Sequence, residues 1–243
     1  MQFQLFDDII TSLRKKMDNW PEEESKNQVL DQEQADWPGS RKNNIVFQSD
    51  TAVELGSPDQ ESVSFILWTN DLSLVNHNTF SLYGPDLPSC GDQSMPFGKV
   101  IVLGGSGFDE DNCYERHQEI DLARYDLNLE GYMIRAVSQY MREWSRISKT
   151  ALERGFDFPT LAKAIRDLYL EFDYIRKVET IFVTSSILDV RELNDLGRKA
   201  TDRIVAMNRI AGEMNLDCDS CDLQEVCNDA IELRKMHRKR MKQ

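Results

Sequence analysis

Three cysteines lie close together near the end of the sequence, in the segment LDCDSCDLQEVCNDA. Cys218, Cys221 and Cys227 have the spacing C-x2-C-x5-C. Two thiolates separated by two residues can bind one metal centre, and a third thiolate six residues later can occupy another corner of it. The spacing therefore predicts a metal or iron–sulfur centre. A redox-active disulfide and three unligated cysteines are the alternatives.

The fourth position of such a centre has no cysteine ligand within this segment. Zinc sites and [4Fe–4S] clusters are usually held by four ligands. The candidates for the fourth are Cys90, Cys113, a histidine, an acid, water or another chain. The acids Asp217, Asp219 and Asp222 flank the thiols and disfavour several thiolates unless a cation is bound. The total of five cysteines is odd, which excludes complete internal disulfide pairing.

Composition limits the classes of function. The formal net charge of the 243-residue chain is −13, which argues against general nucleic-acid binding because contacts to phosphate require a basic surface. The basic end, Glu232–Gln243, is expected to be a solvated helix face, with an acidic partner as the alternative. No apolar run approaches the roughly 20 residues of a membrane span. The start, MQFQLFDDII, has acids where a signal peptide has positive charge.

A cytoplasmic location is therefore expected. Thiols stay reduced in that compartment, which favours metal binding or redox chemistry over structural disulfides for clustered cysteines.

Two other features are weaker candidates for sites. The segment VIVLGGSGFDED is an expected strand that enters glycines, but acids follow the glycines, so a turn is favoured over a phosphate site. His77, His117 and His237 lie far apart in the sequence and have no metal-binding spacing, so surface or hydrogen-bonding roles are expected for them. No motif of a serine hydrolase or of a P-loop kinase occurs.

Short β-type runs separated by turns occupy the first half of the chain. These runs are Ile45–Phe47, Ala52–Leu55, Val63–Trp68, Thr79–Tyr83 and Lys99–Leu103. Helical periodicity follows in LNLEGYMIRAVSQYMREWSRI, FPTLAKAIRDLYLEF and ILDVRELNDLGRKATDRIVAMNRIAGEM, and KVETIFVTS adds one strand. This order predicts an α+β fold: a mixed sheet from the N-terminal half and one later strand, packed with helices from the C-terminal half.

We expect the chain to be organised in three parts. Residues 1–43 form an N-terminal helix, with apolar periodicity over residues 3–17, and an acidic linker or arm. Residues 44–215 form the α+β domain, and residues 216–243 carry the cysteines and a basic C-terminal helix.

Several segments, taken in order, resemble one known family. They are TAVELGSPDQESVSFILWT, FSLYGPDL, MPFGKVIVLGG, LEGYMIRAVSQYMREWSRISKTALERGFDF and VETIFVTSSILDVRELNDLGRKATDRI. Together they are similar to the acetyl-CoA synthase subunit of the carbon monoxide dehydrogenase/acetyl-CoA synthase complex, over its middle α+β domain and the start of its cluster-bearing domain. The resemblance extends over roughly residues 46–227. It implies that Cys218, Cys221 and Cys227 correspond to the first three ligands of the family's iron–sulfur component.

The sequence also departs from the family pattern. The family has a longer gap before its third cysteine, and its fourth cluster cysteine and its nickel-binding Cys-Gly-Cys have no counterpart here. The N-terminal Rossmann-like domain of bacterial members is absent as well. The complete synthase reaction is therefore not expected of this chain alone.

The family loop that carries a tryptophan and arginines at coenzyme A looks shortened in this sequence, with a helix running directly through SQYMREWSRISK. Arg142, Trp144 and Arg146 lie nearby and are candidate cofactor-binding residues, with helix packing as the alternative role.

The resemblance implies a stand-alone, truncated acetyl-CoA-synthase-like protein of anaerobic one-carbon metabolism. It would bind a [4Fe–4S] cluster and act as an accessory or electron-transfer component. The alternative is a non-enzymatic interaction module that docks a corrinoid or dehydrogenase partner, with structural zinc or no metal. A coenzyme-A-binding enzyme is a third hypothesis. The expected partners are components of the dehydrogenase/synthase complex or corrinoid proteins, with homo-oligomerisation as a further expectation.

Overall fold

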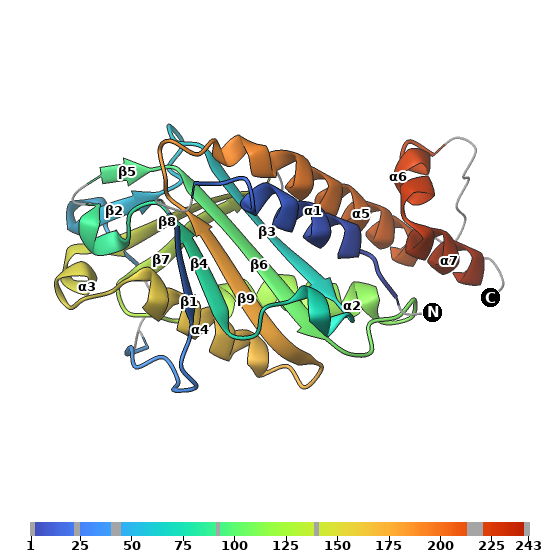
Figure 1. The fold of residues 1–243 in the computed structure, drawn as a ribbon, viewed down its shortest axis with the longest axis horizontal. Coiled ribbons are helices and arrows are strands. Elements are labelled where there is room, and N and C mark those ends of the chain that lie inside the picture. The colour runs from blue at the N-terminus through green and yellow to red at the C-terminus, as the bar shows by residue number, and fades with distance from the viewer. Residues whose placement is uncertain are drawn as a thin grey trace.

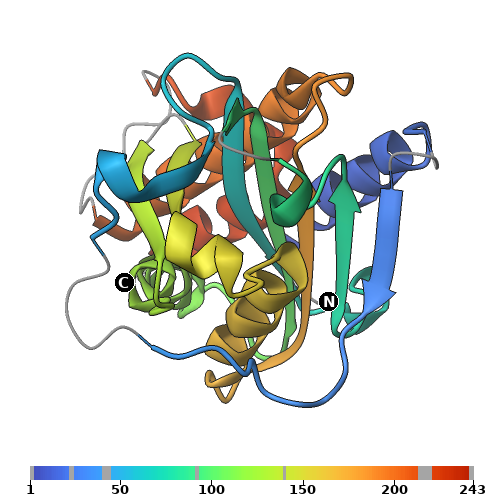
Figure 2. The ribbon, with the colours of Figure 1, turned by 90° about the vertical axis from the view of Figure 1, so that its left-hand side faces the viewer.

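Two mixed β-sheets form the centre of the fold, and helices pack around them (Figure 1). The computed structural model describes residues 3–21, 25–39, 45–90, 93–138, 141–212 and 221–240. Figure 2 shows the smaller sheet beside one end of the larger one. This architecture confirms the predicted α+β class, with most strands from the N-terminal half and the last strand, β9, arriving later in the chain.

The larger sheet has five strands in the order β1-β4-β9-β6-β3. Neighbours pair in parallel in β3/β6 and β4/β9 and antiparallel in β6/β9 and β1/β4. The two long strands β3 and β6 are buried along their whole length, which explains their continuous apolar runs. The strands are β1 (Ser25–Val29), β3 (Ser62–Thr69), β4 (Thr79–Tyr83), β6 (Phe97–Gly105) and β9 (Ile175–Val183).

The smaller sheet has four strands in the order β5-β2-β8-β7. Strands β2 and β5 are parallel, whereas β2/β8 and β7/β8 are antiparallel. The strands are β2 (Thr51–Leu55), β5 (Gln93–Met95), β7 (Tyr132–Ser138) and β8 (Arg142–Ser148).

The helix predicted through LNLEGYMIRAVSQYMREWSRI is wrong, because this segment forms the antiparallel pair β7/β8. In β8 the side chains of Glu143, Ser145 and Ile147 share one face and are fully buried, and Arg146 and Ser148 on the opposite face are nearly as buried. Side chains that alternate between two faces are the mark of a strand. The apolar residues of the segment also fit a helical period, and the sequence alone did not separate the two.

Seven helices of at least five residues surround the sheets in the described part of the chain. They are α1 (Asp7–Met17), α2 (Cys113–Ala123), α3 (Lys149–Glu153), α4 (Phe158–Leu170), α5 (Asn194–Gly212), α6 (Gln224–Asp229) and α7 (Ile231–Arg240). The predicted N-terminal helix, the helix that begins around Pro159 and the long helix before the cysteines are confirmed as α1, α4 and α5.

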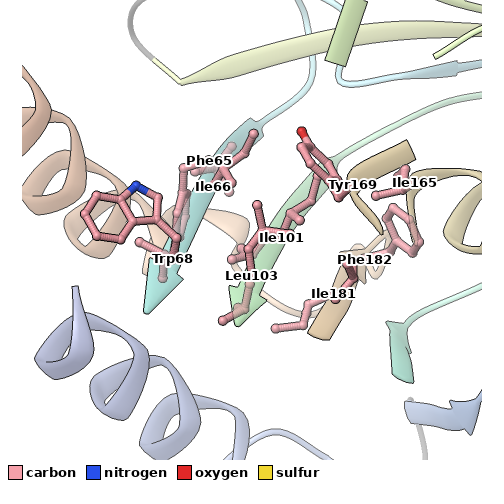
Figure 3. Packing of buried hydrophobic residues seen from close by; sticks show 14 of the residues in the cluster. Phe65, Ile66, Trp68, Ile101, Leu103, Ile165, Tyr169, Ile181 and Phe182 are labelled. Atoms are coloured by element: carbon pink, nitrogen blue, oxygen red, sulfur yellow. The ribbon is translucent and has the colours of Figure 1, made fainter. Parts of the chain in front are cut away.

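Strand β9 shows how the helices cover opposite faces of the larger sheet. Its Phe182 packs on Phe158 of α4, with ring centroids 4.8 Å apart. Three residues earlier, Glu179 points to the other face and pairs with Arg14 of α1. Figure 3 shows this alternation in the core, with Ile181 and Phe182 pointing away from each other. Both faces of the central strands are therefore covered, as their apolar runs require.

Two elements were missed because their side chains carry little periodic signal. Within the stretch expected as an acidic linker, β1 pairs with β4 at the edge of the sheet, although four of its five residues are exposed. After the turn that follows β6, the chain forms a helix, α2, that was not predicted; Cys113, His117 and Ile120 are its buried side. In contrast, the strand predicted over residues 45–47 does not form.

The YGPDL segment is a junction between β4, β9 and α4. Gly84 has φ of +112°, and a Cβ atom there would lie 2.3 Å from the backbone nitrogen of Ser185, so only glycine fits. The Asp86 carboxylate accepts hydrogen bonds from the backbone N–H groups of Leu87 (2.7 Å) and Phe158 (3.0 Å). One aspartate thus satisfies amides at the starts of two helical segments.

A buried ion pair joins the two sheets. Lys99 of β6 donates to Glu143 of β8, with Nζ 2.6 Å from Oε1. The exposed fractions of Lys99 and Glu143 are 3% and 0%. The hydroxyl of Ser64 in β3 donates to Oε2 of Glu143 at 3.0 Å, and the hydroxyl of Ser62 donates to its backbone oxygen at 2.7 Å. The carboxylate therefore contacts both neighbouring strands of the larger sheet.

The pKa directions fit a charged pair. Burial by itself favours the neutral acid, but the charge and hydrogen bonds of Lys99 hold the pKa of Glu143 below its usual range. Burial lowers the pKa of Lys99, while Glu143 opposes this effect.

Removing the carboxylate charge should leave the Lys99 ammonium buried without a counter-ion. We expect Glu143→Gln to lower the free energy of unfolding by about 3–5 kcal/mol, measured by urea denaturation at pH 7. The matched control is Glu130→Gln, because the pair of Glu130 with Arg154 is about half exposed and should be worth less than about 1 kcal/mol. Equal losses in the two variants would contradict the role given to the buried pair.

His117 is held neutral in the core. The indole Nε1–H of Trp68 donates to its Nδ1 at 3.3 Å. Burial, with a smaller contribution from the charge of Arg124, lowers the pKa of His117 to about 4. An ordinary histidine in the unfolded chain titrates near about 6.5. Between these values the unfolded state takes up a proton that the folded state does not.

Stability should therefore fall as the pH falls below about 6.5, by up to about 1.4 kcal/mol per pH unit from this group. His117→Asn keeps an acceptor for the Trp68 indole and should flatten this part of the pH profile, measured as the midpoint of urea unfolding between pH 7 and pH 5. His77→Asn, at an exposed position, is the control and should leave the profile unchanged. If the stability of His117→Asn depended on pH in the same way as that of the wild type, His117 would not be the source of the pH dependence.

Candidate metal centre

The C-terminal helices form a small unit at the far end of α5. Figure 1 shows α6 and α7 beyond the end of α5 that points away from the smaller sheet. Both short helices pack on α5 and on each other. Between them lies a pocket of about 210 Å³ whose apolar wall includes Ala206, Ile210 and Leu223. Two of the predicted ligands, Cys221 and Cys227, line this pocket together. Cys218 lies outside the described residues.

The polar wall of the same pocket is cationic. Arg209, Arg234 and Arg238 line it. The guanidinium of Arg209 donates to the sulfur of Cys221 at 3.5 Å and also pairs with Asp222. This pairing holds the pKa of Asp222 below its usual range. These arginines line the same pocket as the two cysteines.

Cys221 and Cys227 alone do not form a complete set of metal ligands. Among the described residues, no group of three or more His, Cys, Asp or Glu side chains has the geometry to hold a metal ion. The fold therefore places two predicted ligands on one pocket wall, and any metal there requires further donors.

The remaining cysteines of the chain are core residues. Burial, together with the charge of Asp86, raises the pKa of Cys90 to about 11. Burial, with Asp109 adding to it, raises the pKa of Cys113 to about 12. The sulfur of Cys113 lies 3.6 Å from that of Met236, and neither Cys90 nor Cys113 lines the pocket. Both thiols are protonated at neutral pH, which makes them poor metal ligands.

The three histidines lie in three different environments. His77 is exposed in the loop before β4, and His117 is buried against Trp68. His237 of α7 lines the pocket that contains Cys221 and Cys227. Sequence reasoning missed this placement because His237 is ten positions after the last cysteine and joins the pocket only through the packing of α7.

The glycine segment at the end of β6 leads through a turn and the acids Asp109, Glu110 and Asp111 into α2. Asp109 and Glu110 line the hollow beside these glycines. Arg116 donates to the backbone oxygens of Ser106 and Gly107 at 3.0 and 2.6 Å, so this arginine binds the turn itself. Acids in the hollow oppose an anion, which supports the interpretation of the segment as a turn.

The candidate cofactor residues Arg142, Trp144 and Arg146 lie on β8, so the helix expected through them is wrong, and the alternative of helix packing does not apply. Alternation places them on the face of β8 opposite Glu143. The guanidinium groups of Arg135 and Arg146 lie over the indole of Trp144, 4.4 and 5.3 Å from its centroid.

The contacts of these residues differ. Arg146 pairs with Glu54 at 2.6 Å, and Arg142 donates to the backbone oxygen of Gln60. The indole nitrogen of Trp144 is buried and has no hydrogen-bond partner. A flat aromatic ring with adjacent cations suits an anionic ligand.

Comparison with known proteins gives one match. The family model of the CO dehydrogenase/acetyl-CoA synthase complex beta subunit matches residues 40–187. This range contains both sheets except β1, and it ends before α5 and before Cys218, Cys221 and Cys227. A search of the curated proteins found no match. No helix in the described ranges is long and apolar enough to cross a membrane. Because the match covers more than half of the sequence, the chain belongs to the CO dehydrogenase/acetyl-CoA synthase complex beta subunit family.

Proposed function

We propose that this chain binds an iron–sulfur cluster through Cys218, Cys221 and Cys227 and serves as an accessory or electron-transfer component of anaerobic CO and acetyl-CoA metabolism. The observation that carries the proposal is the shared pocket of Cys221 and Cys227. Family membership supports the metabolic setting, and the spacing of the cysteines supports the type of centre.

The surroundings of the pocket suit a cluster with thiolate ligands. Several thiolates bring negative charge into one place, and the arginines of the pocket wall offset it. The apolar wall around Ile210 and Leu223 limits water at the sulfurs, and solvent exposure is one of the factors that set cluster potential. When bound, such a cluster supplies one-electron transfer. The residues of this chain hold it, balance its charge and restrict the access of water.

The position of the pocket supports an accessory role. The helices that line it, α6 and α7 with the end of α5, lie at one end of the molecule, away from the smaller sheet (Figure 1). The partners that we propose are other components of the dehydrogenase/synthase complex or a corrinoid protein, in a cytoplasmic setting. In the alternative proposal, the same cysteines hold structural zinc and the chain is an interaction module.

The cluster proposal predicts a coloured protein. Anaerobic reconstitution with iron and sulfide should give broad absorbance near about 400 nm, and Cys221→Ser should lose most of it because one thiolate ligand is removed. Cys90→Ala, at a core position away from the pocket, is the control and should keep the absorbance. The measurements are the visible spectrum and the iron and sulfide content. A colourless wild-type protein that holds one zinc would support the interaction module instead.

A second candidate function rests on Trp144. Two guanidinium groups lie within 5.3 Å of its ring centroid, and its buried N–H has no hydrogen-bond partner. We propose this face of β8 as a contact for the anionic and aromatic parts of coenzyme A.

Coenzyme A binding by titration calorimetry should weaken roughly tenfold in Trp144→Ala and in Arg135→Ala, through loss of stacking and cationic contacts. Arg154→Ala is the matched control, because Arg154 lies 5.1 Å from the ring of Trp37, away from β8. Equal affinity in all four proteins would rule out this face as the coenzyme contact.

A further inference from the structure

We propose that a second pocket, between the C-terminal end of α1 and strands β1 and β4, binds a small uncharged molecule that carries several hydroxyl groups, such as a hexose or a cyclic polyol. The pocket has a volume of about 490 Å³, within the range of roughly 300–1,000 Å³ that is usual for ligand sites. It lies at the β1/β4 edge of the larger sheet (Figure 2) and shares no lining residue with the cysteine pocket. The proposal is therefore independent of the cluster proposal.

Two buried hydroxyl groups of β4 line this pocket. The exposed fractions of Ser81 and Tyr83 are 7% and 5%. Alternation places both side chains on one face of β4, where their neighbours on β1 are Asn27 and Ser25. Within the described residues, the hydroxyls of Ser81 and Tyr83 have no hydrogen-bond partner. Buried hydroxyls usually have one, so both groups are free to bind a ligand.

The packing of Tyr83 does not require its hydroxyl. Its ring contacts the ring of Trp20 edge to face, with centroids 4.6 Å apart, and phenylalanine would make the same contact. Burial raises the pKa of Tyr83 above its usual value, while the charge of Arg14 opposes this shift, so the hydroxyl is protonated at neutral pH. It can therefore donate one hydrogen bond and accept another.

The charged groups of the pocket disfavour an anionic ligand. Glu179 is 1% exposed, pairs with the guanidinium of Arg14 and accepts a hydrogen bond from the backbone N–H of Asn76 at 2.9 Å. Arg14 also donates to the backbone oxygen of Leu74 at 3.2 Å. The described lining therefore has no unpaired cation for a phosphate or carboxylate. Asp18, which also lines the pocket, is an acid and would repel an anion.

The uncharged groups match a ligand with hydroxyls. The hydroxyls of Ser81 and Tyr83 and the side-chain amide of Asn27 can each donate and accept hydrogen bonds. A sugar hydroxyl does both as well, whereas a carboxylate only accepts and an ammonium only donates. A site that binds ligand hydroxyls rejects an analogue without them, because its own polar groups would stay unpaired. The lining therefore favours an uncharged, hydroxyl-rich molecule.

The test titrates the full isotope-labelled chain with D-glucose and with myo-inositol. It follows the indole N–H signal of Trp20, which lines the pocket, by NMR; Trp20→Phe identifies this signal. At least one probe should shift it in a saturable way. Tyr83→Phe and Ser81→Ala should each weaken binding about three- to tenfold, because each variant loses one hydrogen bond to the ligand. Tyr125→Phe, at an exposed position outside the pocket lining, is the control and should bind as the wild type does.

Loss of binding in the two hydroxyl variants must not come from misfolding. Both substitutions remove a group without a partner in the described residues, so the midpoint of urea unfolding should stay at the wild-type value. The proposal is overturned if neither probe gives a saturable shift up to about 50 mM, which would place any affinity below the range of a specific site. It is equally overturned if inorganic phosphate binds and the two probes do not, or if both hydroxyl variants keep the wild-type affinity.

Discussion

The fold depends on one buried interaction, the ion pair between Lys99 and Glu143. Burying two charges is costly, and the cost is offset only when geometry and hydrogen bonds are good. Here Ser62 and Ser64 complete the hydrogen bonds of Glu143, so β3, β6 and β8 must keep a fixed relative position. The backbone bond from Ser64 to Met141, at 2.6 Å, adds a direct link between β3 and the start of β8. A shift of either sheet by one residue would leave a buried charge without its counter-ion.

The fold was predictable where burial has a simple period. Strands β3 and β6 are buried along their whole length because both faces are covered, β9 ends in the apolar run Ile181–Val183, and α4 and α5 show one apolar stripe. The hairpin of β7 and β8 was not predictable in this way. Its polar residue Glu143 is buried because it pairs with Lys99 of the other sheet. A contact between two sheets leaves no periodic pattern in the sequence. Strand β1 was missed because its backbone pairs with β4 while its side chains stay in solvent.

The candidate site was predictable only as far as the cysteines. The spacing of Cys221 and Cys227 is local, and both residues line one pocket, while the metal centre that the spacing predicts stays a prediction. The arginines of α5 and α7 and the imidazole of His237 reach the same pocket through helix packing, which leaves no motif in the sequence. Residues Arg142, Trp144 and Arg146 were found by resemblance, but their common face follows from β8 being a strand.

The basic helix α7 makes the charge distribution of the molecule asymmetric. The chain as a whole carries a formal charge of −13, yet the helix beside the cysteine pocket has five Lys or Arg residues against one acid. Such a separation of charge produces a dipole that rotates the protein during diffusion, so that an acidic protein meets the α7 end first. The steering is strongest in dilute buffer and fades over a Debye length of about 8 Å at physiological ionic strength. Encounter with an acidic carrier would thus begin at the end of the molecule that holds the cysteine pocket.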